Sequence, residues 1–183
     1  TLIGAVHETT AGPVEIVTGD RDLFQLVDQR VRVLYTARGV GRADVVDDEW
    51  LERKYGVIGR QYADFATLRG DASDGLPGVP GVGEKTAAAL LRQFGDLAGI
   101  QTAATDPDSG LRPAVRRSLL GAGDYLAVAP EVVAVRRDLR LDLPGGAPDS
   151  TALAELGERY GISGPIARAA EALAGLAGQP TPL

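Results

Sequence analysis

The chain has 183 residues, of which 44% are hydrophobic, and a formal net charge of −6. This length and hydrophobic content suit one folded domain with a real core, or one and a half small ones, and exclude a largely disordered chain. Cysteine is absent, so disulfides and thiolate metal sites are excluded. No apolar run reaches membrane-spanning length and no signal-peptide pattern is present, so we expect a cytoplasmic protein without a membrane partner.

Any metal site in this chain must be made of carboxylates, because the only histidine is His7. Oxygen ligands of this kind suit Mg²⁺ or Mn²⁺. The negative net charge argues only weakly against a nucleic-acid partner, since a carboxylate site is itself acidic and basic residues can cluster elsewhere.

The first predicted strand is Val14–Val17, a short β-branched run that we expect to be buried. An acidic turn follows it and leads into a helical segment over 23–27. Ligands of open α/β sheets bind at the carboxyl ends of strands, so Asp20 and Asp22 could both face a metal ion. One of them could instead cap the helix that begins near Leu23. The residues alone leave both interpretations open.

A second strand is predicted at Val31–Tyr35, and the turn over 36–42 makes a hairpin plausible. Four acidic residues at 44–49 could be mistaken for a metal site. We interpret them instead as the start of the helix 49–55, with Asp47 or Asp48 as its N-cap.

The helix predicted over 61–69 leads directly into Gly70 and Asp71. Asp71 and Asp74 are three residues apart and would share one side of a helical turn. The alternative is that Asp74 or Ser73 only caps a turn before Pro77.

A glycine-rich double turn then precedes an alanine- and leucine-rich helix over 86–94. Free N–H groups at such a helix start attract phosphate. The spacing from Gly78 to Thr86 nearly matches a nucleotide-binding P-loop, but Glu84 is inserted before Lys85. The insertion rotates the lysine by about 100° and adds negative charge, so we expect no nucleotide cofactor.

The rest of the chain is predicted to be mainly helical. Helices are expected over 97–101, capped by Asp96, and over 111–120, where Arg112, Arg116 and Arg117 form a basic face that is either solvated or in contact with DNA backbone. Later predictions are a helix over 124–129, a strand over 132–135, a hinge over 144–148, and helices over 151–160 and 166–176.

Two stretches of this sequence carry a resemblance to a known family. GDASDGLPGVPGVGEKTAAALL resembles the helix–three-turn–helix segment of the 5′-nuclease family of flap endonucleases and 5′→3′ exonucleases, which includes the N-terminal domain of bacterial DNA polymerase I. TGDRDLFQLV is similar to that family's second acidic motif. The resemblance runs from Gly12 to about Leu176. It implies an α/β fold, with part of a PIN-like (Rossmann-like) nuclease core in residues 1–66 and a mainly helical region in 67–183, whose helix–three-turn–helix motif spans about 70–95.

The resemblance also implies the roles of particular residues. Metal would be held by Asp20, Asp22, Asp71 and Asp74, and the catalytic residues would be Asp20, Asp22 and Asp74. The residues expected to bind the DNA duplex are Gly78, Gly81, Val82, Gly83, Lys85, Thr86 and Arg92. A monovalent cation such as K⁺ is expected at the same turns.

The expected function is that of a metal-dependent 5′→3′ exonuclease or structure-specific flap endonuclease in bacterial DNA replication and repair. The family's first half has no counterpart here, so only one half of a two-metal site is expected. This chain alone should be inactive or weakly active, and its exposed sheet edge should threaten solubility. The alternatives are a non-catalytic DNA-binding module and, more remotely, a scaffold domain. The sequence shows no polymerase start, which favours a stand-alone nuclease.

Overall fold

The structure, a computed structural model, describes residues 12–140 and 149–177. The chain divides into two compact units, Thr1–Leu141 and Asp142–Leu183, and each is described by itself. The expectations for residues 1–8, the hinge at 144–148 and the C-terminal tail lie outside the described residues.

The first unit contains a three-stranded sheet of β1 (Val14–Thr18), β2 (Val31–Tyr35) and β3 (Asp44–Val46), in that order. β1 and β2 are parallel, whereas β2 and β3 are antiparallel, so the predicted hairpin is present. Ile16, Val33 and Val46 are register partners across the three strands and are all buried.

The prediction of a fully buried first strand was wrong. Val17 is 63% exposed, and Glu15 is exposed on the same face of β1. The strand therefore alternates between a buried and an exposed side, which is the pattern of a sheet with one covered face among the described residues.

The short element η1 (Arg21–Leu26) and the helix α2 (Asp48–Tyr55) pack beside the sheet, whereas η2 (Val40–Arg42) between β2 and β3 is exposed. Asp47 is the N-cap of α2, since its carboxylate accepts a hydrogen bond from the backbone N–H of Trp50 at 2.8 Å. Asp48 instead accepts one from the N–H of Gly59 at 2.7 Å. The N-cap predicted at Asp47 or Asp48 is therefore confirmed at Asp47, while the bond from Asp48 to Gly59 was not predicted.

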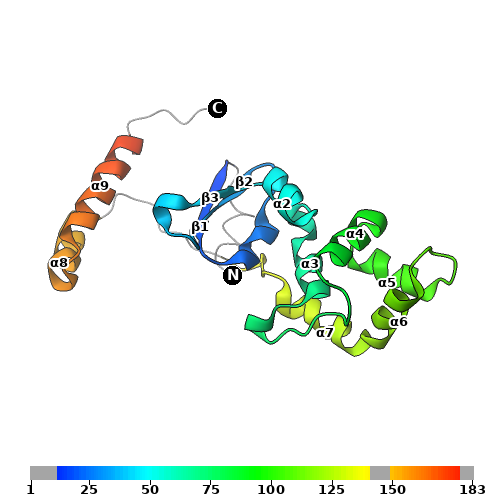
Figure 1. The fold of residues 1–183 in the computed structure, drawn as a ribbon. Helices are drawn as coiled ribbons and strands as arrows, with labels where there is room; N and C mark the ends of the chain where they lie inside the picture. Colours follow the sequence, from blue (N-terminus) through cyan, green and yellow to red (C-terminus); the bar gives the residue numbers. More distant parts are fainter. Residues whose placement is uncertain (1–11, 141–148, 178–183) are drawn as a thin grey trace. The chain divides into compact units, whose positions relative to one another are not determined.

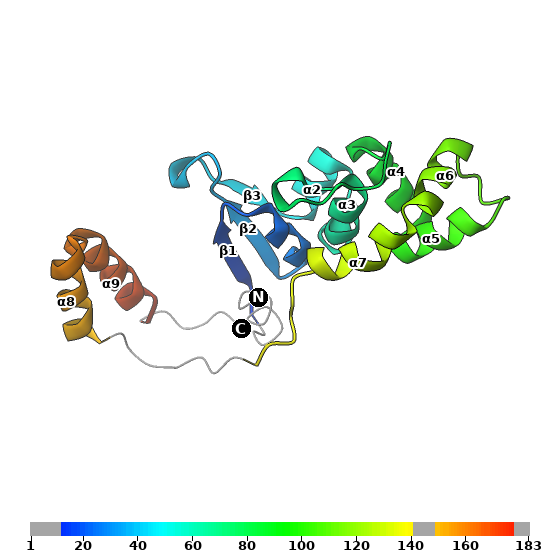
Figure 2. The same cartoon turned by 90° about the horizontal axis from the view of Figure 1, so that it is seen from below.

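The remainder of the first unit is helical. Its elements are η3 (Gly59–Gln61), α3 (Tyr62–Arg69), η4 (Ala72–Asp74), α4 (Glu84–Phe94), α5 (Leu97–Thr105), α6 (Pro113–Gly121) and α7 (Gly123–Val133). α3 lies between the sheet side and the later helices, and α5 and α6 lie farthest from the sheet (Figures 1 and 2). The predicted boundary between 66 and 67 falls inside α3, and the division into nuclease core and C-terminal region stays a prediction.

The strand predicted over 132–135 is not formed. Val132 and Val133 are the last residues of α7, and the N–H of Ala134 closes the helix on the carbonyl of Pro130 at 3.0 Å. Packing explains the difference, because the buried side of α7 outweighs the β-preference of the valines.

The second unit is a pair of helices, α8 (Ser150–Tyr160) and α9 (Ser163–Ala177), as the sequence predicted. Asp149 caps α8 by accepting hydrogen bonds from the N–H groups of Thr151 and Ala152. Gly161, with a φ of 67°, ends the helix and allows the chain to reverse.

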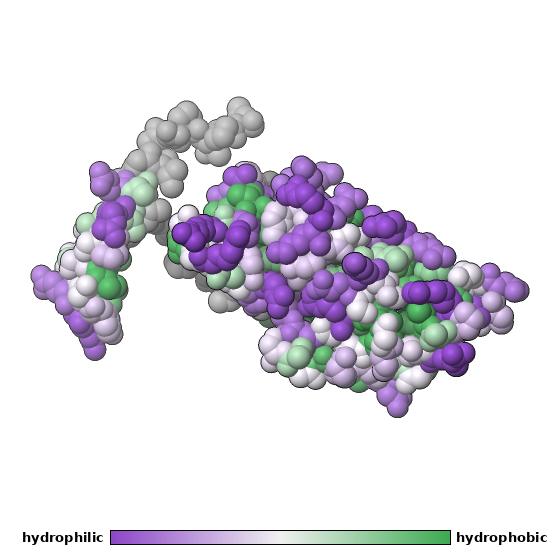
Figure 3. All heavy atoms as spheres, viewed as in Figure 1, coloured by the Kyte–Doolittle hydropathy of each residue, from purple (hydrophilic) through white to green (hydrophobic). Residues whose placement is uncertain are grey.

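Polar residues cover most of the visible surface of the first unit, with small hydrophobic patches between them (Figure 3). Large aromatic side chains of this unit pack together in the core, where Phe24 makes edge-on contacts with Tyr35, Trp50 and Tyr62. Among the described residues, no helix has the length and apolar character that crossing a membrane requires.

Candidate functional site

Two segments that are far apart in the sequence meet at one cavity. The first is the turn after β1, and the second is the loop that follows α3. A cavity of about 390 Å³ between them is lined by Gly19, Asp20, Arg21, Asp22, Asp71, Ser73 and Asp74. The four aspartates singled out from the sequence therefore surround one cavity.

Asp20 and Asp22 lie where β1 passes into η1. Asp20 is the N-cap of η1, and its carboxylate accepts a hydrogen bond from the N–H of Asp22 at 2.9 Å. Capping, one of the two roles that the sequence left open, is therefore present. It does not exclude the other role, because only one oxygen of the exposed Asp20 carboxylate has this bond.

Asp22 is half-buried, and burial raises the pKa of its carboxyl group above the usual range. The charges of Asp20, Asp74 and Asp71 raise this pKa further, while Arg21 lowers it. The cavity therefore has a local excess of negative charge that a cation would relieve.

Asp71 is the most constrained of the four aspartates. Its Oδ1 accepts hydrogen bonds from the N–H (3.0 Å) and the hydroxyl of Ser73, so Asp71 caps η4. The alternative left open for Asp74 or Ser73, that one of them caps this turn, is therefore met by Asp71 instead. Oδ2 faces the guanidinium groups of Arg69 at 3.4 Å and Arg21 at 3.9 Å. The Ser73 hydroxyl, with lesser help from the arginines, lowers the pKa of the Asp71 carboxyl.

Asp74 is exposed at the end of η4. Its side chain makes no hydrogen bond or ion pair with the part of the chain that the structure describes. Its exposed carboxylate is therefore open to a ligand.

The donor set fits a hard divalent cation in its chemistry, because it offers carboxylate oxygens that repel one another. Within the described ranges, however, no three acidic or histidine side chains form a group that could hold a metal ion as they stand. Ligation by three of these carboxylates would require side chains to rotate toward a common point.

The glycine turn is packed tightly against the end of α3. Gly70 and Gly78 have φ values of 81° and 70°, and a Cβ on Gly78 would lie 2.4 Å from the carbonyl oxygen of Arg69. Val79 donates its N–H to the carbonyl of Leu68 at 2.9 Å, which joins the turn to the helix. Only glycine fits at these two positions, where backbone meets backbone.

The outer part of the turn is open. Gly81 has a φ of 76°, and a Cβ on Gly81 or Gly83 would meet nothing within 4 Å. Val82 is different, because its side chain is buried and its N–H donates to the carbonyl of Val79 at 2.9 Å. Val82 therefore anchors the turn, whereas the two glycines face solvent.

The turn ends at α4, whose N-cap Gly83 provides no side-chain cap. The first N–H groups of the helix thus lack the side-chain acceptor that usually covers them. Lys85 and Arg92 are exposed and lie seven residues apart, which places them on one face of α4. Thr86 is half-buried in the first turn.

Other charged residues have structural partners. Arg116 of the predicted basic face donates to the carbonyls of Asp106 (2.6 Å) and Pro107 (2.8 Å) and to the Ser109 hydroxyl (3.0 Å), so it holds a loop. Arg112 and Arg117 are exposed.

Sequence reasoning missed Arg69, because nothing in its local pattern shows that it reaches both Asp71 and Glu84.

Comparison with known proteins identifies the family of this chain. Residues 57–153, more than half of the chain, match the family described as 5′-3′ exonuclease, C-terminal SAM fold. A 5′-3′ exonuclease of Streptomyces coelicolor is 56% identical over 174 residues, which cover 91% of the chain and 58% of the relative. One from Mycobacterium tuberculosis is 43% identical over 180 residues, covering 91% and 57%. The chain thus spans less than two thirds of these relatives.

Solved structures show the same fold. A T5 5′-exonuclease with bound zinc superposes with a TM-score of 0.59 at 17% identity, over 72% of this chain and 46% of that one. A T5 D15 flap endonuclease in a product-like complex with DNA and metal ions has a TM-score of 0.57 at 16% identity, over 93% and 57%. The family match over residues 57–153 includes the glycine turn and its helices, and the chain belongs to the 5′-3′ exonuclease family.

Proposed function

We propose that this chain is the C-terminal part of a divalent-metal-dependent 5′→3′ exonuclease or structure-specific flap endonuclease acting on DNA. The observation that carries the proposal is the cavity where four aspartates from two distant segments meet, beside a glycine turn and an uncapped helix start. In finer detail, we propose that the sheet is part of a PIN-like core and that the protein acts in the bacterial cytoplasm, at the nucleoid.

Asp20, Asp22 and Asp74 would hold Mg²⁺ or Mn²⁺, with Asp71 beside them. The chemistry that such an ion supplies is neutralisation and Lewis-acid activation of a phosphodiester. Burial raises the pKa of the Asp22 carboxyl and the neighbouring carboxylates raise it further, so a bound cation would be favoured by the negative charge around the cavity. We propose that these carboxylates supply one half of a two-metal site.

The DNA backbone would bind at Gly81, Gly83 and the first turn of α4. Amide N–H groups there attract a phosphate, and Lys85 and Arg92 add positive charge along one exposed face. Gly78 and Val82 would shape the turn from beneath. Carbonyl oxygens of the same turn could accept a K⁺ ion.

A second candidate function is a non-catalytic DNA-binding module. It is favoured by one observation, that the described carboxylates form no group ready to hold a metal ion. The same turn and helix would then bind DNA without cutting it.

The deciding experiment is cleavage of an end-labelled 5′-flap duplex with Mn²⁺ or EDTA. The chain is tested alone and together with the part of the Streptomyces relative that has no counterpart in it. Asp74→Asn is compared with Glu131→Gln, which removes an exposed charge from α7. Metal-dependent cutting lost only in Asp74→Asn supports the nuclease. DNA binding without cutting in either combination supports the binding module, and folded protein that does neither overturns both.

A further inference from the structure

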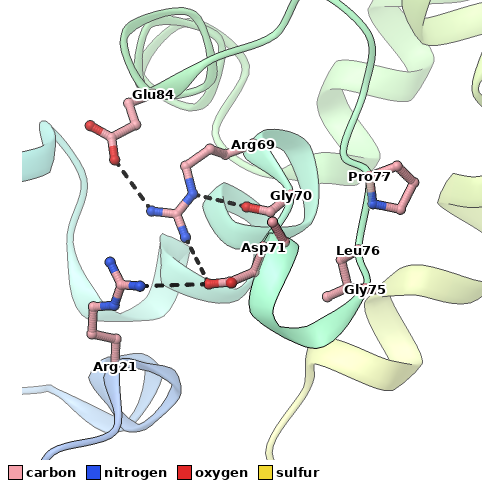
Figure 4. Close-up of a pocket in the computed structure, with 9 residues that line it drawn as sticks. Arg21, Arg69, Gly70, Asp71, Gly75, Leu76, Pro77 and Glu84 are labelled. Atoms are coloured by element: carbon pink, nitrogen blue, oxygen red, sulfur yellow. Dashed lines mark hydrogen bonds and ion pairs between the residues drawn. The ribbon is translucent and has the colours of Figure 1, made fainter.

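Arg69 occupies the junction between the aspartate cavity and the glycine turn. It is the last residue of α3, and its side chain is only 14% exposed. The guanidinium lies over the ring of Phe65, with its central carbon 5.2 Å from the ring centroid. It lines a second cavity of about 630 Å³, which it shares with Arg21, Asp71 and Glu84 (Figure 4).

The three nitrogen atoms of Arg69 bond in three directions. Nε donates to the carbonyl of Gly70 at 3.0 Å. One terminal nitrogen faces Asp71 Oδ2 at 3.4 Å, and the other faces Glu84 Oε1 at 3.4 Å. As Figure 4 shows, one side chain thus joins the start of the turn, an aspartate of the first cavity and the first turn of α4.

We propose that Arg69 is a positioning residue that couples the two halves of the site, so that metal binding at the aspartates and DNA binding at the turn strengthen each other. The inference rests on the proposed function. Its specific content is that the coupling passes through the Asp71–Arg69–Glu84 bridge.

The Asp71–Arg69–Glu84 bridge fixes the relative positions of these residues and adds little to the free energy of folding. Both ion pairs are long, and the Glu84 side chain is 57% exposed, so water screens that arm. The guanidinium itself is held by Phe65 and by the Gly70 carbonyl, and its planar fork can address two carboxylates at fixed angles. A movement of Asp71 on metal binding is therefore transmitted to the residue that begins α4.

A different role would be simple charge compensation, in which any cation at position 69 suffices. Arg69→Lys separates the two roles, because lysine keeps the charge but cannot span both carboxylates and the carbonyl as a planar fork. Glu84→Gln removes the charge from the α4 arm alone and leaves only a neutral oxygen there, and its exposed position makes misfolding no concern. Arg53→Met is the matched control, since Arg53 forms an exposed ion pair with Glu49 elsewhere on the first unit.

The experiment measures the affinity of a fluorescently labelled 5′-flap duplex by anisotropy, with Mn²⁺ and with EDTA at equal ionic strength. For the parent chain we expect Mn²⁺ to tighten binding at least about fivefold, the lower range of usual coupling between sites. Arg69→Met and Arg69→Lys should both reduce this factor to about twofold or less. Glu84→Gln should bind at least as tightly as the parent in EDTA, because a repulsive charge is removed, and yet lose the gain from Mn²⁺. Arg53→Met should keep the parent's gain in affinity from Mn²⁺.

Three results would overturn the inference. If Arg69→Lys keeps the parent's factor, charge alone suffices. If all variants keep the parent's gain in DNA affinity from Mn²⁺, the bridge does not couple metal binding to DNA binding. If the parent binds both Mn²⁺ and DNA, measured separately by calorimetry and anisotropy, but shows no gain, the inference fails while the proposed function stands. A folded parent that binds neither ligand refutes the proposed function itself. Circular dichroism checks folding, and Arg69→Lys and Glu84→Gln decide the matter if Arg69→Met does not fold.

Discussion

The carboxylate of Asp64 on α3 accepts a hydrogen bond at 2.9 Å from the backbone N–H of Leu97, the first residue of α5. The two residues are distant in sequence, and the bond ties α3, which precedes the glycine turn, to α5, which follows α4. Burial raises the pKa of the Asp64 carboxyl, and the Leu97 bond only partly opposes this effect.

Asp64→Ala should therefore destabilise the first unit, because the N–H of Leu97 loses its acceptor. The expected loss in the free energy of unfolding is about 1–3 kcal/mol. Asp64→Asn keeps an acceptor oxygen and removes the cost of a half-buried charge, so it should be as stable as the parent or more so at pH 7. Urea denaturation of the two variants and the parent measures both effects.

The pH dependence has a definite sign. Since the folded chain holds the Asp64 proton more tightly than the unfolded chain, the burial cost is fully present above the raised pKa and disappears below the ordinary value of 3.8. Any advantage of Asp64→Asn over the parent should thus shrink as pH falls through this window. An advantage that grows in acid would contradict the explanation.

Gly78→Ala and Gly81→Ala should differ strongly although both glycines have positive φ. A Cβ at Gly78 would lie 2.4 Å from the carbonyl oxygen of Arg69, while a Cβ at Gly81 would meet nothing within 4 Å. Gly81→Ala should cost only the backbone strain, about 1 kcal/mol. Gly78→Ala should cost several times more and disrupt the turn. Thermal unfolding of both variants tests this, and equal melting temperatures would show that the close approach is unimportant.

Gln25 should hold the segment after α7 against the sheet side of the first unit. Its buried amide donates to the carbonyl of Val133 at 3.1 Å and accepts from the N–H of Val135 at 2.8 Å. In Gln25→Met we expect the Val135 amide to lose its protection from hydrogen exchange, with global stability reduced by about 1–3 kcal/mol. Gln93→Met changes an exposed residue and serves as the control. Unchanged protection at Val135 would refute the role of Gln25.

The local features of this site could be predicted from the sequence wherever one segment determines them. The acidic turn after β1, the cap at Asp47 and the helix after the glycine turn follow from nearest neighbours and helical spacing. The features that the sequence did not reveal depend on packing between distant segments. The end of α7 at Val133 and the reach of Arg69 to Glu84 are of this kind, because Val133 bonds to Gln25 and Arg69 bonds to a residue on another helix. The cap at Asp71 is instead a local feature, since Ser73 lies two residues along the chain.

Lys85 and Arg92 should each contribute to DNA affinity through phosphate contact rather than base contact. They lie on one exposed face of α4, and Ala89 lies between them with a side chain too small to keep a backbone away. Removing one phosphate contact lowers the slope of log affinity against log salt by about one. Lys85→Met and Arg92→Met should each show that change and weaken binding similarly for unrelated DNA sequences.

Anisotropy titrations between about 50 and 200 mM salt measure the slope. Arg53→Met removes the same charge from α2 and should leave the slope as it is in the parent, because Arg53 is paired with Glu49 on α2 and is not part of the proposed phosphate-binding face of α4. Ala89→Glu extends the test, since a carboxylate between the two cations should lower DNA affinity while the unfolding free energy of an exposed helix position hardly changes. If Lys85→Met, Arg92→Met and Ala89→Glu all keep the parent's slope and affinity, α4 does not face the DNA. The duplex must then bind another surface of the chain.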